Sequence, residues 1–401
     1  MSASPSRRVA HRVLIRVFDE GAYADRAFAA EAAELDPRDR AFAQRTAYGA
    51  IQRVRTLDHA LETIGGRRVA DLDVPVRASL RLGAYELAFL DGVPARASVN
   101  EAVELVRAAG AGRATGLVNA ILRRAVEQIR PLLDELPQET AAEAAIKHSY
   151  PDWVAETWWR EWGPADASGL MRAQNEPPET AYRVIGTGET RVVDRIDPDD
   201  VEQGRVWPQS RGSQLAGAAV GATEGDRVLD LCAAPGGKTT QLAERAAEVV
   251  AVELHPGRAR ELEESVRRLG FDNVTVVNAD ARELPTELTG FDRVLVDAPC
   301  SGLGVLASRP DLRWRAQPLS ELQLELLRVA AERAKPGGSV TYSVCTIARA
   351  ENEGVVDESG LRVEPLEDKW PEFAHPRRPE FLLTLPHKHR TSGFFVANLR
   401  P

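Results

Sequence analysis

The chain has 401 residues, of which 43% are hydrophobic and 28% are charged, and this length is sufficient for two or three domains with buried cores. Its 51 basic and 60 acidic residues give a formal net charge of −9, which excludes a generally basic nucleic-acid-binding surface, so any nucleic-acid contact would use local patches. The three cysteines have no CxxC spacing, and no apolar run is long enough to span a bilayer. We therefore expect a cytoplasmic protein without disulfides, a bound metal or a membrane anchor.

Residues 1–135 carry the patterns of α-helices. Valines recur every four residues from position 9 to position 17, which places them on one face of a helix. A further helix is predicted to begin after Asp36, because an aspartate followed by a proline is typical of a helix start. Ser98 and Glu101 are expected to form a capping box. The region predicts an all-helical domain.

The composition changes after a proline-containing stretch at residues 131–140, which we interpret as a linker. Residues 141–210 contain four closely spaced tryptophans, at positions 153, 158, 159 and 162. Such a cluster favours a small hydrophobic core, with a base-stacking platform as the alternative. We expect a small connecting subdomain here.

Two short basic clusters could contact nucleic acid: "RPDLRWR" at residues 309–315 and "HKHR" at residues 387–390. Each is also consistent with an ordinary solvated face, which is the more common role of such a charge cluster.

From residue 227 onward, short Val-rich strands are predicted to alternate with helices. This pattern is typical of a doubly wound α/β fold with a mostly parallel sheet. Ligands of such folds bind beyond the carboxyl ends of the strands. Cys300 and Cys345 each follow a predicted strand and are therefore expected at that edge.

The turn after the first of these strands reads "DLCAAPGGKTT" (residues 230–240). It lacks both the Walker A spacing and the GxGxxG pattern, so it does not predict a phosphate-binding loop. Glu253, Asp280 and Asp297 end the next three predicted strands. Three carboxylates would repel a polyphosphate, but they suit a ligand with a diol, an amino group and an ammonium. This combination favours S-adenosylmethionine.

Several of these motifs resemble those of a known family. "DLCAAPGGKT", "DAPCSG" and "TYSVCT" followed by "AENE" resemble three motifs of the RNA cytosine-C5 methyltransferases, and "GFFVANL" resembles the strand that closes their domain. "RAFAQRTAYGAIQRVRTLDHAL", "LRLGAYELAFL", "SVNEAVELVR" and "GLVNAILRR" are similar to the NusB-like domain of the bacterial ribosomal RNA small subunit methyltransferase B (Sun/Fmu-like) family. The resemblance covers nearly the whole chain. It implies an α/β, Rossmann-like S-adenosylmethionine-dependent methyltransferase domain at 211–401, preceded by an all-α NusB-like domain at 1–135 and a connecting, RNA-binding subdomain at 141–210.

The resemblance also implies roles for individual residues. Cys345 would be the nucleophile, Cys300 the second thiol, and Asp297 a residue that hydrogen-bonds the base as well as the cofactor. The cofactor-binding residues would be Cys232, Ala233, Ala234, Pro235, Gly236, Gly237, Lys238, Glu253, Asp280 and Asp297. Three departures stand out: Glu253 replaces a usual aspartate, Ser392 replaces the acid often seen before the closing "GFF", and residues 183–210 are shorter than the family's usual RNA-binding subdomain.

The chemistry explains why two thiols would be useful. Carbon 5 of cytosine is a poor nucleophile until a thiolate adds to carbon 6, and a second thiol can assist the later release. The alternative is that these cysteines are buried packing residues, which we favour only for Cys232. The implied substrate is 16S ribosomal RNA with an unpaired or flipped cytosine, bound by a monomer. Alternatives are a transfer RNA cytosine-C5 methyltransferase and a NusB-like RNA-binding adaptor with a vestigial catalytic domain. A DNA enzyme would use the thiol of the "PC" pair and would not need Cys345.

Overall fold

The computed structural model describes residues 3–401, which form two compact units. One unit comprises residues up to Asn175 together with Leu306–Arg315, and the other comprises Glu176–Val305 and Ala316–Pro401. In this division residues 141–175 belong with the helices that precede them, whereas residues 176–210 belong with the sheet. The three-domain division at 1–135, 141–210 and 211–401 stays a prediction.

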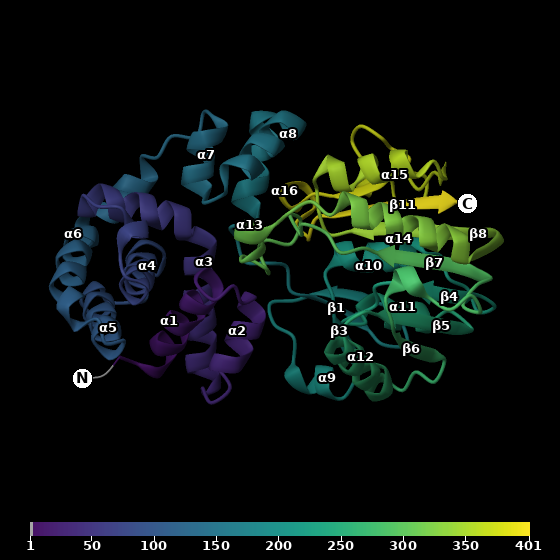
Figure 1. Cartoon of the computed structure of the whole chain (residues 1–401), viewed down its shortest axis with the longest axis horizontal. Helices are drawn as coiled ribbons and strands as arrows, with labels where there is room; N and C mark the ends of the chain where they lie inside the picture. Colours follow the sequence, from purple (N-terminus) through teal and green to yellow (C-terminus); the bar gives the residue numbers. More distant parts are fainter. Residues whose placement is uncertain (1–2) are drawn as a thin grey trace. The chain divides into compact units, whose positions relative to one another are not determined.

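The first unit is helical (Figure 1). Its α-helices are α1 (Pro5–Phe18), α2 (Ala24–Glu31), α3 (Pro37–Gly65), α4 (Val74–Phe89), α5 (Ala95–Ala108), α6 (Thr115–Asp134), α7 (Ala141–His148), α8 (Asp152–Ala173) and α13 (Leu312–Arg315).

Local sequence patterns predicted some helix boundaries correctly and others wrongly. As predicted, α3 begins after Asp36, whose carboxylate accepts hydrogen bonds from the N–H groups of Arg38 and Asp39. The predicted capping box at Ser98 is wrong, because α5 already begins at Ala95 and Ser98 lies inside it. The buried Ser98 hydroxyl instead donates to Glu86 Oε2 at 2.7 Å. The proline at position 131, which we placed in a linker, lies inside α6.

The segment Leu306–Arg315 packs within the helical unit, although its sequence neighbours belong to the other unit. Arg313 is fully buried and donates to the carbonyl oxygens of Gln52 and Ser149, both at 2.9 Å. The indole N–H of Trp314 donates to the Ile51 carbonyl oxygen at 2.7 Å. Arg313 is therefore a core residue. It belongs neither to a solvated face nor to an RNA-binding patch.

The tryptophan cluster contributes mainly one core residue. Trp158 is fully buried, with its ring centroid 5.3 Å from that of Tyr150, whereas Trp153 is 38% exposed. The core interpretation is thus correct for Trp158.

The second unit is an α/β unit with two sheets. Its strands are β1 (Ala181–Val184), β2 (Thr190–Val192), β3 (Val206–Pro208), β4 (Arg227–Asp230), β5 (Glu248–Glu253), β6 (Val274–Asn278), β7 (Phe291–Asp297), β8 (Ala334–Val344), β9 (Arg362–Glu364), β10 (Leu382–Thr384) and β11 (Phe394–Arg400). Its α-helices are α9 (Pro198–Glu202), α10 (Arg211–Ala219), α11 (Gly237–Ala243), α12 (Pro256–Leu269), α14 (Ser320–Arg333), α15 (Glu353–Ser359) and α16 (Pro386–His389).

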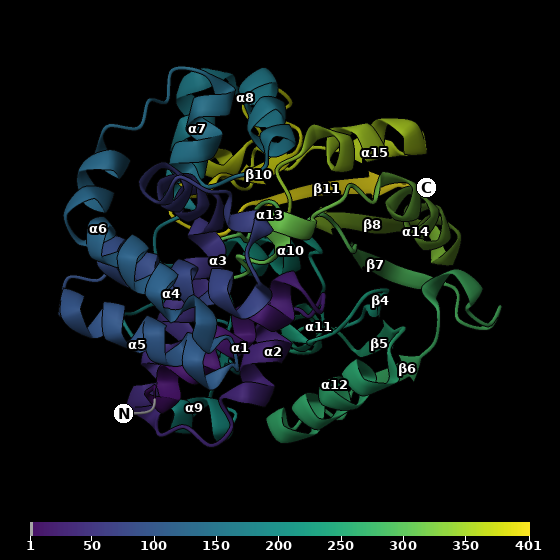
Figure 2. The same ribbon diagram turned by 60° about the vertical axis from the view of Figure 1, so that its left-hand side comes forward.

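The larger sheet has the strand order β10-β11-β8-β7-β4-β5-β6, with β9 paired to β11. Strands β4 to β8 are parallel, and β11 runs antiparallel to β8. Figure 2 shows α12 alongside β5 and β6, and α14 near β8 with α15 packed against α14. The strand order reverses between β4 and β7, and a crevice beyond the carboxyl ends is expected at such a point. Within residues 3–401, no helix is both long enough and apolar enough to cross a membrane.

Candidate active site

The loop after β4 needs glycine at two positions, for its backbone conformation at Gly236 and for the lack of a side chain at Gly237. Gly236 has a φ of +105°, and a Cβ atom there would lie 2.6 Å from Leu262 Cδ1. At Gly237 a Cβ atom would lie 2.8 Å from the indole nitrogen of Trp207. The loop is tied to β5, because the Ala233 N–H donates to the Val252 carbonyl oxygen at 3.0 Å.

The other residues of this loop occupy different environments. Pro235 is exposed and follows a cis peptide bond from Ala234. The Ala234 carbonyl oxygen accepts a hydrogen bond from Arg258 at 2.8 Å. Burial raises the pKa of the Cys232 thiol well above its usual value, which favours a packing role for that side chain.

Two predicted carboxylates lie at the ends of β5 and β6. Glu253 is buried, and its Oε1 accepts a hydrogen bond from the His255 N–H at 2.9 Å. Asp280 follows β6, caps the turn that begins at Ala281, and forms an ion pair with Arg282 at 2.7 Å. Hydrogen bonds from Arg282 lower the pKa of Asp280, so this carboxylate is charged at neutral pH.

The structure adds an acid that the sequence analysis missed. Asp230 ends β4 and is 1% exposed, and its Oδ2 accepts a hydrogen bond from Thr239 Oγ1 at 2.8 Å. Within residues 3–401 its Oδ1 has no hydrogen-bond partner. Burial raises the pKa of Asp230 to about 7. The signal was available, since Asp230 stands at a strand end just as Glu253 and Asp297 do.

Lys238 and Asp297 form a partly buried ion pair between the loop after β4 and the end of β7. The Lys238 ammonium is 2.7 Å from Asp297 Oδ2, and Ser343 Oγ donates to Asp297 Oδ1 at 2.5 Å. Lys238 also lies over the Phe394 ring, 4.8 Å from its centroid. The pair brings together two residues that were predicted separately.

Cys300 and Cys345 meet beside this ion pair. Their sulfur atoms are 3.4 Å apart, and both side chains are partly exposed. The hydrogen bond between them raises the pKa of Cys300 well above its usual value and lowers that of Cys345. The positive charge of Lys238 lowers the pKa of Cys345 further. These directions correspond to an arrangement in which Cys300 donates the hydrogen bond and Cys345 carries the negative charge.

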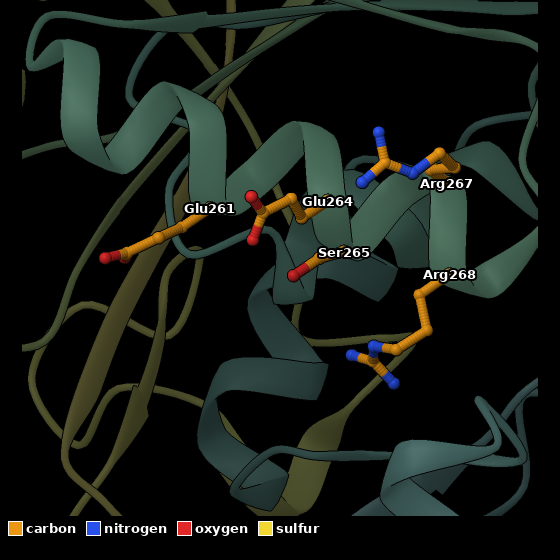
Figure 3. Close-up of a pocket in the computed structure, with 5 residues that line it drawn as sticks. All are labelled: Glu261, Glu264, Ser265, Arg267 and Arg268. Carbon is orange, nitrogen blue, oxygen red and sulfur yellow. The ribbon is translucent and has the colours of Figure 1, made fainter.

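A shallow surface hollow lies elsewhere, on the second half of α12 (Figure 3). Its lining combines two carboxylates, a hydroxyl and two guanidiniums, from Glu261, Glu264, Ser265, Arg267 and Arg268. None of the candidate site residues lines it.

The parallel sheet, its glycine-dependent first loop and the acids at its strand ends define a Rossmann-like methyltransferase domain. Residues 218–400 match the family model described as 16S rRNA methyltransferase RsmB/F, and residues 4–127 match the NusB family model. The chain therefore belongs to the ribosomal RNA small subunit methyltransferase B family. The predicted fold class and family are both confirmed.

Full-length relatives support this assignment. The chain is 33% identical to the "probable ribosomal RNA small subunit methyltransferase B" of Synechocystis, over 98% of this chain and 99% of the relative. It is 35% identical to the "ribosomal RNA small subunit methyltransferase B" of Thermus thermophilus, over 100% and 98% of the two chains.

Solved structures show the same fold. The crystal structure of PH0851 is 24% identical and superposes with a TM-score of 0.79, covering 100% of both chains. A methyltransferase homolog protein from Pyrococcus horikoshii, also 24% identical, gives a TM-score of 0.55 over 66% of this chain and 99% of the other. At these identities the likeness concerns the fold alone.

Proposed function

We propose that this protein methylates carbon 5 of a cytosine in 16S ribosomal RNA, with S-adenosylmethionine as methyl donor and through a covalent bond from Cys345 to carbon 6. The observation that carries the proposal is the 3.4 Å thiol pair with opposite pKa shifts beside Lys238 and Asp297. The names of the full-length relatives support ribosomal RNA as the substrate. We further propose that the protein acts as a monomer in the cytoplasm.

The residues around the first loop fit S-adenosylmethionine. The orphaned buried Oδ1 of Asp230 is an acceptor that a ligand's ammonium could satisfy. The missing Cβ atoms at Gly236 and Gly237 let Leu262 and Trp207 pack against the loop, which fixes the loop's shape. Glu253 and Asp280 would contact the ribose and the adenine. When bound, the cofactor would supply an electrophilic methyl group on a sulfonium.

The two thiols would act in sequence. Cys345, as the thiolate, adds to carbon 6 and makes carbon 5 nucleophilic, while Asp297 hydrogen-bonds the base. After methyl transfer, the carbon 5 proton must leave and the bond between sulfur and carbon 6 must break, so that the double bond of the ring forms again. The hydrogen bond to Cys345 is the main cause of the raised pKa of Cys300. Because bonding of Cys345 to the base removes that cause, Cys300 becomes easier to ionise when a base is needed.

Covalent trapping tests this division of labour. Cys300→Ala should accumulate a protein–RNA adduct in the presence of S-adenosylmethionine, because addition proceeds and release is blocked. Cys345→Ala and the double variant should form no adduct, and denaturing gel electrophoresis distinguishes these outcomes. An adduct that requires Cys300 and survives the loss of Cys345 would show that the roles are reversed. If no variant and no wild-type protein labels RNA, the adaptor alternative gains support.

A further inference from the structure

Glu351 is a fully buried carboxylate that the proposed mechanism does not use. Its Oε1 accepts hydrogen bonds from the Ser301 N–H at 2.9 Å, the Leu319 N–H at 3.1 Å and the Gln323 side-chain amide at 2.9 Å. Its Oε2 accepts from the Ser301 hydroxyl. A buried charge with this many donors is held in one place, and it holds its donors in turn.

The residues that follow the two cysteines are linked to each other. Ser301 follows Cys300, Thr346 follows Cys345, and their hydroxyl oxygens are 2.9 Å apart in a hydrogen bond. Both side chains are buried, so water does not compete for this bond. In addition, the Gly304 N–H donates to the Cys345 carbonyl oxygen at 3.0 Å. The loop that carries Cys300 is thus joined to the loop that carries Cys345 at two points.

Gln323 anchors the other side of Cys300. Its side-chain amide donates to the Pro299 carbonyl oxygen at 2.9 Å as well as to Glu351. Both sequence neighbours of Cys300 are therefore fixed through one buried network, whereas the thiol itself remains partly exposed.

We propose that Ser301, Thr346 and Glu351 are positioning residues that hold the Cys300 and Cys345 thiols at the separation required for addition and release. We call these two hydroxyl residues and the carboxylate that holds Ser301 the hydroxyl clamp. The catalytic part of this inference, that the clamp speeds methyl transfer, rests on the proposed function. The geometric part, that the clamp holds the two thiols close together, does not. None of the three needs to touch the substrate, because each acts through the backbone next to a cysteine.

Glu351 has a second, electrostatic effect on the pair. After the hydrogen bond to Cys345, burial and the charge of Cys345, the negative charge of Glu351 is a further cause of the raised pKa of Cys300. It therefore helps to keep the proton on Cys300 and the negative charge on Cys345. Glu351→Gln separates this effect from positioning, because the Gln carbonyl can accept from the three N–H donors and the Ser301 hydroxyl can turn to donate to Thr346.

The geometric part is tested with phenylarsine oxide, whose arsenic binds two thiols at once only when they are close together. The wild-type protein without RNA should bind the arsenical through both sulfurs, and Cys300→Ala defines the background. Thr346→Val keeps the shape but removes the hydroxyl, and Ser301→Ala removes its partner. Both should weaken arsenical binding about tenfold or more, since loss of a buried hydrogen bond releases the loops. Ser320→Ala, which removes a nearby hydroxyl bond to the Ala350 carbonyl oxygen, is the matched control and should bind like the wild type.

Turnover tests the catalytic part. Thr346→Val should lower kcat about 10- to 100-fold, as expected for misplaced reacting groups, and should leave the KM for RNA within about twofold. For Glu351→Gln, alkylation by iodoacetamide followed by peptide mass spectrometry should show a higher ratio of modified Cys300 to modified Cys345, which a purely structural role would not produce.

Two results separate the failures. If Thr346→Val and Ser301→Ala bind the arsenical and turn over like the wild type, the hydroxyl clamp is overturned while the proposed function stands. If they lose arsenical binding but the wild-type protein methylates no RNA, the clamp geometry stands and the proposed function fails.

Discussion

Replacing Lys238 with methionine tests how the site makes Cys345 reactive. Lys238 is 8% exposed, and its ammonium is 2.7 Å from Asp297. The hydrogen bond from Cys300 is the main cause of the lowered pKa of Cys345, and the charge of Lys238 adds to it, whereas Asp297 opposes it. Lys238→Met removes the favourable charge and leaves the unfavourable one, so the pKa of Cys345 must rise.

The size of this rise follows from the surroundings of Lys238. A nearby opposite charge shifts a pKa by about 1–3 units, and the pairing with Asp297 offsets part of the ammonium's effect. We therefore expect the pKa of Cys345 to rise and the amount of Cys345 thiolate to fall about tenfold at any pH below the pKa.

The assay is the rate of Cys345 alkylation by iodoacetamide, followed by peptide mass spectrometry from about pH 6 to pH 10. The profile of Lys238→Met should move to higher pH, whereas Lys238→Arg, which keeps the charge, should move less. An unchanged profile for Lys238→Met would refute the argument that Lys238 favours the Cys345 thiolate.

Three further predictions concern the loop and the helical unit. Gly236→Ala should weaken S-adenosylmethionine binding at least tenfold in titration calorimetry. A φ of +105° costs an alanine about 1–3 kcal/mol, and the alanine Cβ would clash with Leu262. Gly257→Ala is the control and should bind normally, because the space around Gly257 is open. Burial lowers the pKa of His148 to about 4. The contribution of neutral His148 to the free energy of unfolding is therefore complete above about pH 6.5, and about 3 kcal/mol of it is lost as the pH drops to about 4. In thermal unfolding, His148→Gln should lack this pH dependence. Arg313→Met should destabilise the helical unit by about 1–3 kcal/mol for each carbonyl left without a donor, and an unchanged melting temperature in thermal unfolding would contradict this.

The sequence predicted the catalytic sheet well for a physical reason. Val-rich strands bounded by glycine, proline and acidic residues mark their own ends, and the carboxyl ends of parallel strands share one edge. This placed Glu253 and Asp297 correctly at strand ends, and Cys300 and Cys345 shortly after strand ends. The assignment of the nucleophile came from the family motifs, because strand periodicity cannot distinguish one thiol from the other.

Other features could not be predicted because they depend on contacts between distant residues. The basic cluster around Arg313 looks like a surface patch, and its burial depends on carbonyl groups of Gln52 and Ser149 far away in the sequence. The bond between Ser301 and Glu351 joins residues 50 positions apart. At Ser98 the capping pattern was present, but a helix start at Ala95 and a buried partner, Glu86, overrode it.

The most direct test of the proposed function is nucleoside mass spectrometry of small-subunit ribosomal RNA after incubation with the protein and S-adenosylmethionine carrying a labelled methyl group. The RNA should come from a strain that lacks this enzyme, so that the target cytosine is unmodified. We predict labelled 5-methylcytidine with the wild-type protein and none with Cys345→Ala. Label in another nucleoside, or equal labelling by Cys345→Ala, would contradict the proposal that Cys345 drives methylation of carbon 5.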